Sequence, residues 1–316
     1  MIDQQSLIKM KSHQRGLTMV EMMVAITVGL ILTAGIIQIF VNSKQTYRVE
    51  EALSRVQENG RLGLNVMAND IRMAGYWGCQ PSPSNVQNNL NKGSGFIDFT
   101  SGGISGTEGG SGVPDSVTLR GADGSSGLTP QPNGGSGKYS PLPSADLAVN
   151  SPNDLVSGEI LLVSDCVGGD IFQITNANPG GSGSVVHNTG AGSPGNATNL
   201  SKVYKGDASI FSVKEITYTI APGSDGQPAL WRSVNGTNQE IVDNVSDLQV
   251  LYGEDMDKDR SVDRYVDANN VSDFNNVYSV KIRLTIQTAE ANTTVNAGNR
   301  VTHDFTTTVA IRNRVL

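Results

Sequence analysis

Cysteine, histidine and charged side chains are all scarce in this chain. Two cysteines in 316 residues are too few for a disulfide-rich scaffold. The formal net charge of −7 disfavours generic nucleic-acid binding by the whole surface, although it leaves room for a local basic patch. The three histidines, His13, His187 and His303, are scattered, and no nucleophile–base pair stands out. These absences argue against an enzyme.

One long apolar run is present near the N-terminus. Residues 22–41 contain no charged side chain, and about 20 residues of helix span a bilayer core. An ordinary secretory signal has a shorter apolar core of about 7–15 residues. Lys9, Lys11 and Arg15 precede the run, so the positive-inside rule places the N-terminus in the cytoplasm and the rest of the chain outside. A plain single-pass anchor is the simplest interpretation.

Glu21 does not fit a plain anchor, because an ionisable side chain at the edge of a membrane segment is costly. It is the fifth residue after Gly16, which ends a short basic leader. This combination closely resembles the type IV prepilin signal. The resemblance implies that residues 1–16 are a leader, that prepilin peptidase cleaves between Gly16 and Leu17, and that the new amine of Leu17 is methylated. Met10 is an alternative start that leaves the leader MKSHQRG.

The resemblance also implies a role for Glu21 in assembly. A carboxylate in a medium of low dielectric constant needs a partner. In assembled pilins the partner would be the amino terminus of a neighbouring subunit, so Glu21 would favour docking into a filament at the correct axial offset.

A helix from residue 17 to about residue 74 is predicted, on the order of 85 Å long. We expect residues 17–41 to form its transmembrane or filament-core part and residues 42–75 to form an amphipathic part that lies on a globular domain. Gly75 is expected to mark the helix end. The apolar stripe of the second part consists of Val49, Leu53, Val56, Gly60, Leu64, Met67 and Ile71.

The globular domain is predicted to cover residues 76–316. Its part from about 93 to 158 is rich in Gly, Ser, Pro and Asn, so we expect a flexible insertion that buries little apolar surface. Two interpretations of this insertion stay open: it is either a passive loop or a partner-binding surface. Strand-like islands interrupt it at 95–99 and 115–120, and a second loop is expected at 176–199.

The remainder of the domain shows the period-two alternation of half-buried antiparallel strands. Gly226 is expected in a hairpin turn. The expected fold class is therefore α+β, with the long helix packed on an antiparallel sheet. Strands are expected at 159–165, 170–175, 209–220, 228–234, 245–253, 277–288 and 303–315.

The two cysteines stand where a bond between them would fasten the insertion. Cys79 follows the predicted helix end, and Cys166 ends a predicted strand. Disulfides persist outside the cytoplasm, so we expect the two to be joined. The bond would close a loop of roughly 90 residues and stabilise the fold by ~4 kcal/mol in the chain-entropy model. Two buried free thiols are the alternative.

An acidic loop lies at residues 253–268. Its aspartates at relative positions 1, 3, 5 and 9 are Asp255, Asp257, Asp259 and Asp263. Odd spacing in a tight loop converges carboxylates on one centre, as in EF-hand-like calcium loops. Arg260 replaces the usual glycine, and Val266 replaces the usual final acid, although Asp267 is adjacent. We expect a weak structural Ca²⁺ site. The alternatives are a solvated acidic turn and a degenerate site whose charge is neutralised by Lys258, Arg260 and Arg264.

Several stretches beyond the leader resemble the PilW family of minor pilins. They are RMAGYWGC (72–79), EILLVSDCVGGDIFQITN (159–176), DLQVLYGEDMDKDRSVDRYVDA (247–268) and TTTVAIRNRVL (306–316). The resemblance implies a low-abundance subunit that, with other minor pilins, primes pilus assembly in the inner membrane and then caps the filament. Its implied partners are the other minor pilins, the major pilin, a PilY-type tip adhesin and prepilin peptidase. Twitching, adhesion and, in competent bacteria, DNA uptake would depend on it.

Two other functions stay open. A GspJ-like pseudopilin of a type II secretion system shares the leader and the helix. A DNA-uptake receptor would bind DNA itself. Removal of the leader takes away Asp3 and three basic residues and leaves a net charge of −9, which argues against direct nucleic-acid binding.

Overall fold

The computed structural model describes residues 16, 18–79, 83–93, 95–99, 103–123, 127–133, 137–142, 146–291 and 300–315. The chain divides into two compact units, residues 1–52 and residues 53–316. The described part of the first unit is helical from Met19 onward. The second unit contains the rest of that helix and every described strand.

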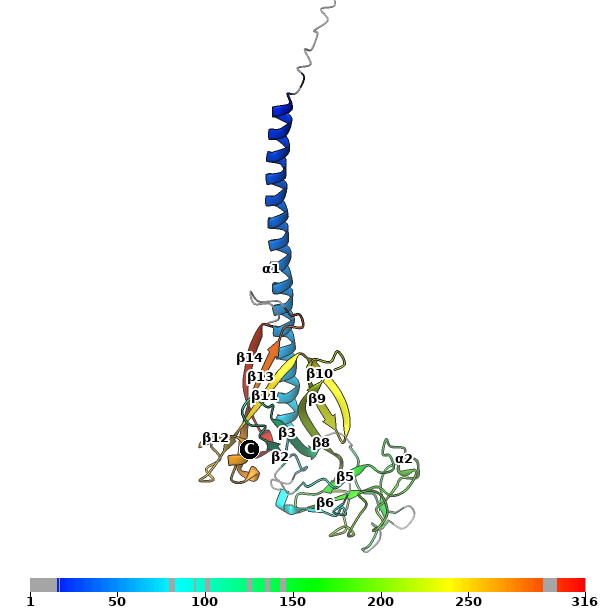
Figure 1. The fold of residues 1–316 in the computed structure, drawn as a ribbon. Coiled ribbons are helices and arrows are strands. Elements are labelled where there is room, and N and C mark those ends of the chain that lie inside the picture. Colours follow the sequence, from blue (N-terminus) through cyan, green and yellow to red (C-terminus); the bar gives the residue numbers. More distant parts are fainter. Residues whose placement is uncertain are drawn as a thin grey trace, which may run out of the picture. The chain divides into compact units, whose positions relative to one another are not determined.

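Helix α1 runs from Met19 to Met73 (Figure 1). The predicted apolar stripe is confirmed within the second unit, where four of its members are buried. These are Val56, Gly60, Met67 and Ile71. The helix ends where the sequence predicts, because Gly75 adopts φ 70°, the left-handed conformation that commonly follows a helix. The predicted start at Leu17 lies outside the described residues.

A sheet of eight strands has the order β1-β6-β5-β8-β3-β2, and β8 also pairs with β9, which pairs with β10. β1 is parallel to β6, and the other described strand pairs of this sheet are antiparallel. Its strands are β1 (Val86–Asn88), β2 (Ile104–Thr107), β3 (Ser116–Ala122), β5 (Ile160–Ser164), β6 (Gly169–Gln173), β8 (Ser209–Pro222), β9 (Pro228–Val234) and β10 (Thr237–Asp243).

A second antiparallel sheet has the order β12-β11-β13-β14, and β4 pairs with β7 in a small third sheet. These strands are β11 (Val245–Glu254), β12 (Arg264–Val266), β13 (Val277–Gln287), β14 (Thr302–Ala310), β4 (Asp146–Ala148) and β7 (Ser184–Val186). The short helices are α2 (Pro179–Ser182), α3 (Arg312–Val315), η1 (Pro83–Asn85), η2 (Ala268–Asn270) and η3 (Phe274–Asn276).

The second half of α1 packs against both large sheets and shares one hydrophobic core with them. Met67 and Ile71 are fully buried in this core, and burying such a side chain stabilises a fold by roughly 1.5–3 kcal/mol. Gly60 and Gly63 bring the helix backbone close to the sheets. A side chain at Gly60 would overlap the ring of Phe305, and a Cβ at Gly63 would lie 3.0 Å from Leu284.

Most strands predicted from the sequence are confirmed. β9 has the predicted bounds, and β5, β6, β8, β11 and β13 differ from prediction by at most two residues at either end. Gly226 lies at φ 78° in the turn between β8 and β9, as expected for a hairpin. The island at 115–120 is β3, a strand inside the large sheet.

Some local predictions are wrong, and six of the described strands were not expected: β1, β2, β4, β7, β10 and β12. Residues 95–99 form no strand, although Phe99 is buried against Trp77 with ring centroids 5.5 Å apart. The last predicted strand stops at Ala310, and residues 312–315 are helical. β10 was not expected, yet Asn235 and Gly236 both have positive φ in the turn that joins it to β9, which is the signature of a tight hairpin.

The expectation of an insertion with little buried surface is wrong for its described parts. Ile104, Val117 and Leu119 belong to the core that α1 shares with the sheets. Leu147, Val149 and Leu155 belong to a second core around β5 and β6. These short apolar segments are held by contacts with distant strands, which the local composition does not reveal.

We predict that Gly60→Ala destabilises the protein, although alanine usually favours a helix. The added methyl group meets the Phe305 ring, and overpacking of this kind costs roughly 1–3 kcal/mol. In a Phe305→Ala background the same change should be neutral or stabilising, because the ring is gone. Thermal melting of the four proteins of this double-mutant cycle measures the difference. An equal effect of Gly60→Ala in both backgrounds would contradict the contact.

Candidate functional site

The first site is the N-terminal end of α1. Thr18 caps the helix, and Glu21 occupies its third position. The backbone N–H and the hydroxyl of Thr18 donate to Oε2 of Glu21 at 2.9 and 3.0 Å. The N–H of Glu21 donates to Oγ1 of Thr18 at 3.3 Å. This reciprocal arrangement is a capping box, which satisfies two backbone donors at the helix end.

The capping role of Glu21 was not predicted, although its signal, a threonine three residues before a glutamate, is visible in the sequence. Gly16 is described and exposed. Residues 1–15 and Leu17 lie outside the described residues. Cleavage after Gly16 and methylation of Leu17 therefore stay predictions from the motif.

The apolar run of α1 has no protein partner among the described residues. Every residue from Met19 to Val41 is exposed, and α1 is long and apolar enough to cross a membrane. Its threonine hydroxyls are satisfied within the helix: Thr27 donates to the carbonyl of Met23 at 2.8 Å, and Thr33 donates to that of Gly29 at 2.7 Å. Such a surface suits lipid or neighbouring apolar helices rather than water.

The predicted disulfide is present. Cys79 lies six residues beyond the end of α1, and Cys166 follows β5. Their Cα atoms are 5.1 Å apart, and 87 positions separate them in the sequence. The bond ties the end of α1 to the β5–β6 hairpin and encloses the described parts of the Gly/Ser-rich segment. This connection limits how far the unfolded chain can expand.

The acidic loop brings three of its four predicted aspartates together. One carboxylate oxygen from each of Asp255, Asp257 and Asp263 lies within 4.8 Å of the others. Asp259 is outside this group and instead accepts from the N–H of Ser261 at 2.7 Å. Asp267 caps η2 by accepting from the N–H of Asn270. The structure thus narrows the candidate ligand set to three carboxylates.

The loop backbone makes the turn that glycine usually supplies. Arg260 adopts φ 70°, so a residue other than glycine holds the left-handed conformation at position 6. Asp255 is buried, and its two oxygens accept from the N–H groups of Lys258 and Arg260 at 2.6 and 2.8 Å. Carboxylate oxygens keep further lone pairs after such bonds, and Ca²⁺ prefers oxygen ligands of this kind. The residues present therefore fit a Ca²⁺ ion.

Glu254, directly before the loop, is a fully buried carboxylate with its own partners. It accepts from Nη2 of Arg264 at 2.9 Å and from the N–H groups of Ser272 and Asp273 at 2.9 and 3.1 Å. Burial raises the pKa of Glu254, but these hydrogen bonds outweigh it and leave the pKa below its usual value. Glu254 therefore fixes the base of the loop as an ionised group.

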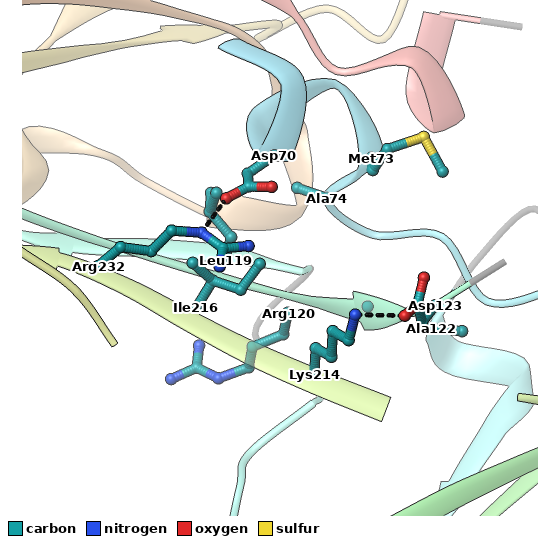
Figure 2. Close-up of a pocket in the computed structure, with 11 residues that line it drawn as sticks. Asp70, Met73, Ala74, Leu119, Arg120, Ala122, Asp123, Lys214, Ile216 and Arg232 are labelled. Atoms are coloured by element: carbon teal, nitrogen blue, oxygen red, sulfur yellow. Dashed lines mark hydrogen bonds and ion pairs between the residues drawn. The ribbon is translucent and has the colours of Figure 1, made fainter. Parts of the chain in front are cut away.

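A pocket of about 140 Å³ lies between the last turn of α1 and strands β3, β8 and β9 (Figure 2). On its α1 side, Oδ2 of Asp70 accepts from Nε of Arg232 at 2.7 Å and from the hydroxyl of Tyr218 at 2.5 Å. Lys214 forms an ion pair with Asp123 on the other side. The charged groups that Figure 2 draws as dashed pairs neutralise each other. The contacts of Asp70 with Arg232 and Tyr218 join the end of α1 to the sheet beside this pocket.

The two described histidines lie in different environments. His187 is buried against Phe172, and burial lowers its pKa. His303 is exposed on β14 and contacts Phe305. His13 lies outside the described residues. The described histidines therefore do not come together in one site, in agreement with their scatter in the sequence.

Two family models match the chain, at opposite ends. The model described as "Prokaryotic N-terminal methylation motif" matches residues 11–37, which include Gly16, Leu17 and Glu21. The model described as "Type IV Pilus-assembly protein W" matches residues 217–313, which include β9 to β14. No curated protein and no solved structure matches the chain significantly. Together, the two matches and the long apolar helix support a PilW-like, prepilin-type protein of the type IV pilus.

Proposed function

We propose that this chain is a minor pilin that takes part in priming type IV pilus assembly and then sits at the pilus tip. The observation that carries the proposal is the PilW-family match over residues 217–313. These residues include the strands that contact α1 through Leu230, Val242 and Leu284. The match therefore includes strands that pack directly against α1.

The helix supplies the physical basis for assembly. Before assembly, its exposed apolar run would anchor the subunit in the inner membrane with the globular domain in the periplasm. Prepilin peptidase would cut after Gly16. Thr18 donates two hydrogen bonds to the carboxylate of Glu21 but brings no positive charge, so the negative charge itself would still favour a cationic partner. Docking would bring the terminal amine of a neighbouring subunit within bonding distance of the Glu21 carboxylate.

The partners we propose follow from this role. Other minor pilins would form the priming complex, the major pilin would be added beneath it, and a PilY-type adhesin would occupy the tip. Twitching, adhesion and DNA uptake would depend on the filament and thus on this subunit. Direct binding of DNA is disfavoured by the net charge of −9 after removal of the leader.

We also propose a structural Ca²⁺ site in the acidic loop. The supporting observation is the convergence of oxygens from Asp255, Asp257 and Asp263 within 4.8 Å. A cation there would reduce the repulsion between these carboxylates and hold the loop between β11 and β12. Asp257 and Asp263 are exposed, which leaves the ion a path from solvent.

The assembly proposal predicts the effect of a clean deletion. Surface pili, measured as sheared major pilin, should collapse, whereas total major pilin in the cells should stay normal, because initiation and not synthesis is lost. A strain that expresses the protein again is the control. Unchanged piliation together with loss of secreted enzymes would contradict the proposal and would favour a GspJ-like pseudopilin of type II secretion.

The Ca²⁺ proposal predicts a rise in melting temperature of several degrees when Ca²⁺ is added, because a ligand at a hundred times its Kd stabilises by about 2.7 kcal/mol. EGTA should reverse the rise. Asp257→Asn should abolish it, and Asp225→Asn, the same charge change in the remote β8–β9 turn, should not. An equal response of both variants, or no response of the parent protein, would refute the site.

A further inference from the structure

His187 is a buried histidine whose ring nitrogens bond to no described residue. Its exposed fraction is 1%, and neither Nδ1 nor Nε2 has a hydrogen-bond partner among the described side chains and backbone groups. The ring packs on that of Phe172 in β6, with the two centroids 5.1 Å apart. A neutral imidazole carries one donor and one acceptor, and leaving them unpaired in the interior costs free energy. His187 is therefore a weak point in the packing around it.

His187 directly follows β7, a strand of three residues that closes over a hydrophobic core. Val185 of β7 is fully buried in this core, together with Phe172 and Ile174. We call residues 184–188 the β7 strap. Because the strap covers part of the core, the state of the His187 ring bears on whether the core stays covered.

Two residues just beyond β6 fasten the strap by hydrogen bonds. The N–H of Thr175 donates to the carbonyl of Val186 at 2.8 Å, and the N–H of Val186 donates to Oδ1 of Asn176 at 3.0 Å. Nδ2 of Asn176 donates to the carbonyl of Ser184 at 2.7 Å. The N–H of Asn188 donates to Oγ1 of Thr175 at 3.1 Å. The amide protons of Thr175, Val186 and Asn188 therefore report whether the strap is closed.

Two carboxylates, on β4 and β6, act electrostatically on the His187 ring without bonding to it. Asp146 of β4 accepts from the hydroxyl of Ser184. Asp170 of β6 accepts at 2.7 Å from the hydroxyl of Tyr204, whose pKa is raised by burial so that it stays protonated. Burial of His187 outweighs both carboxylates and leaves its pKa below the usual value of about 6.5. The closed strap therefore holds the neutral ring.

We infer that the β7 strap is released by acid: it is closed while His187 is neutral and opens when His187 binds a proton. In the closed position an imidazolium would be buried without a hydrogen-bond acceptor among the described residues, which is costly. In the open position water would solvate it. Opening would break the bonds to Thr175 and Asn176 and uncover Phe172. Acid would thereby expose an apolar surface of the kind that binds partners.

The pH window follows from the direction in which the pKa of His187 is shifted. A histidine whose pKa is lower in the closed state than in the open state favours closure while it is neutral. Closure is therefore most stable above about pH 6.5, the pKa of a solvated histidine, and weakens as the pH falls below that value. One proton changes the ratio of open to closed molecules by at most about tenfold for each pH unit.

Hydrogen exchange of the full chain in detergent measures this opening. Peptides that cover residues 172–176 and 184–189 should exchange at least about tenfold faster at about pH 5.0 than at about pH 7.5, after correction for the intrinsic rate. A peptide from β13, which belongs to a different core, should change less than about twofold. Equal protection of the strap at both pH values would overturn the inference. An equal loss of protection in β13 would also overturn it, because the whole domain would then be unfolding.

Matched substitutions assign the response to one histidine. His187→Phe keeps a ring against Phe172 but binds no proton, so the strap should lose its pH dependence. His303→Phe makes the same change at the exposed histidine of β14 and should keep the response of the parent protein. If the larger ring prevents folding, His187→Met supplies a flexible apolar side chain in its place. A response of about tenfold that persists without His187 would show that another group opens the strap and would refute the inference.

Discussion

Close contact between the second half of α1 and the two large sheets is the interaction on which the globular unit depends. Gly60 and Gly63 let the helix backbone approach Phe305 and Leu284, and Met67 and Ile71 then become fully buried. The ion pair of Asp70 with Arg232 fixes the last turns of the helix on the sheet, and the Cys79–Cys166 bond fastens the chain that follows. One core thereby joins segments from residue 56 to residue 311.

The same helix has a different task in its first half. No described side chain covers the apolar residues from Met19 to Val41, whereas the capping box of Thr18 and Glu21 satisfies the helix end. A helix of this composition is stable in lipid or among similar helices, which is what a pilin requires in its membrane-bound and assembled states.

Patterns that depend on near neighbours were predictable from the sequence. The spacing of Val56, Gly60, Met67 and Ile71 predicted the buried stripe of α1. The alternation of apolar and polar residues in β13 predicted which of its side chains are buried. Features that depend on distant contacts were not predictable. Ile104 and Phe99 lie in a glycine-rich region, yet packing against residues distant in the sequence buries both. The left-handed conformation of Arg260 and the grouping of three rather than four aspartates likewise depend on the folded loop.

Prepilin-type processing is tested directly by the mass of the mature protein purified from the membranes of its own cells. We predict a chain that begins at Leu17 and carries one methyl group on its terminal amine, because residues 11–37 match the N-terminal methylation motif. A protein that keeps residues 1–16 in cells with active prepilin peptidase would contradict it. The apolar helix would then be a plain membrane anchor, and Glu21 would act only as a helix cap.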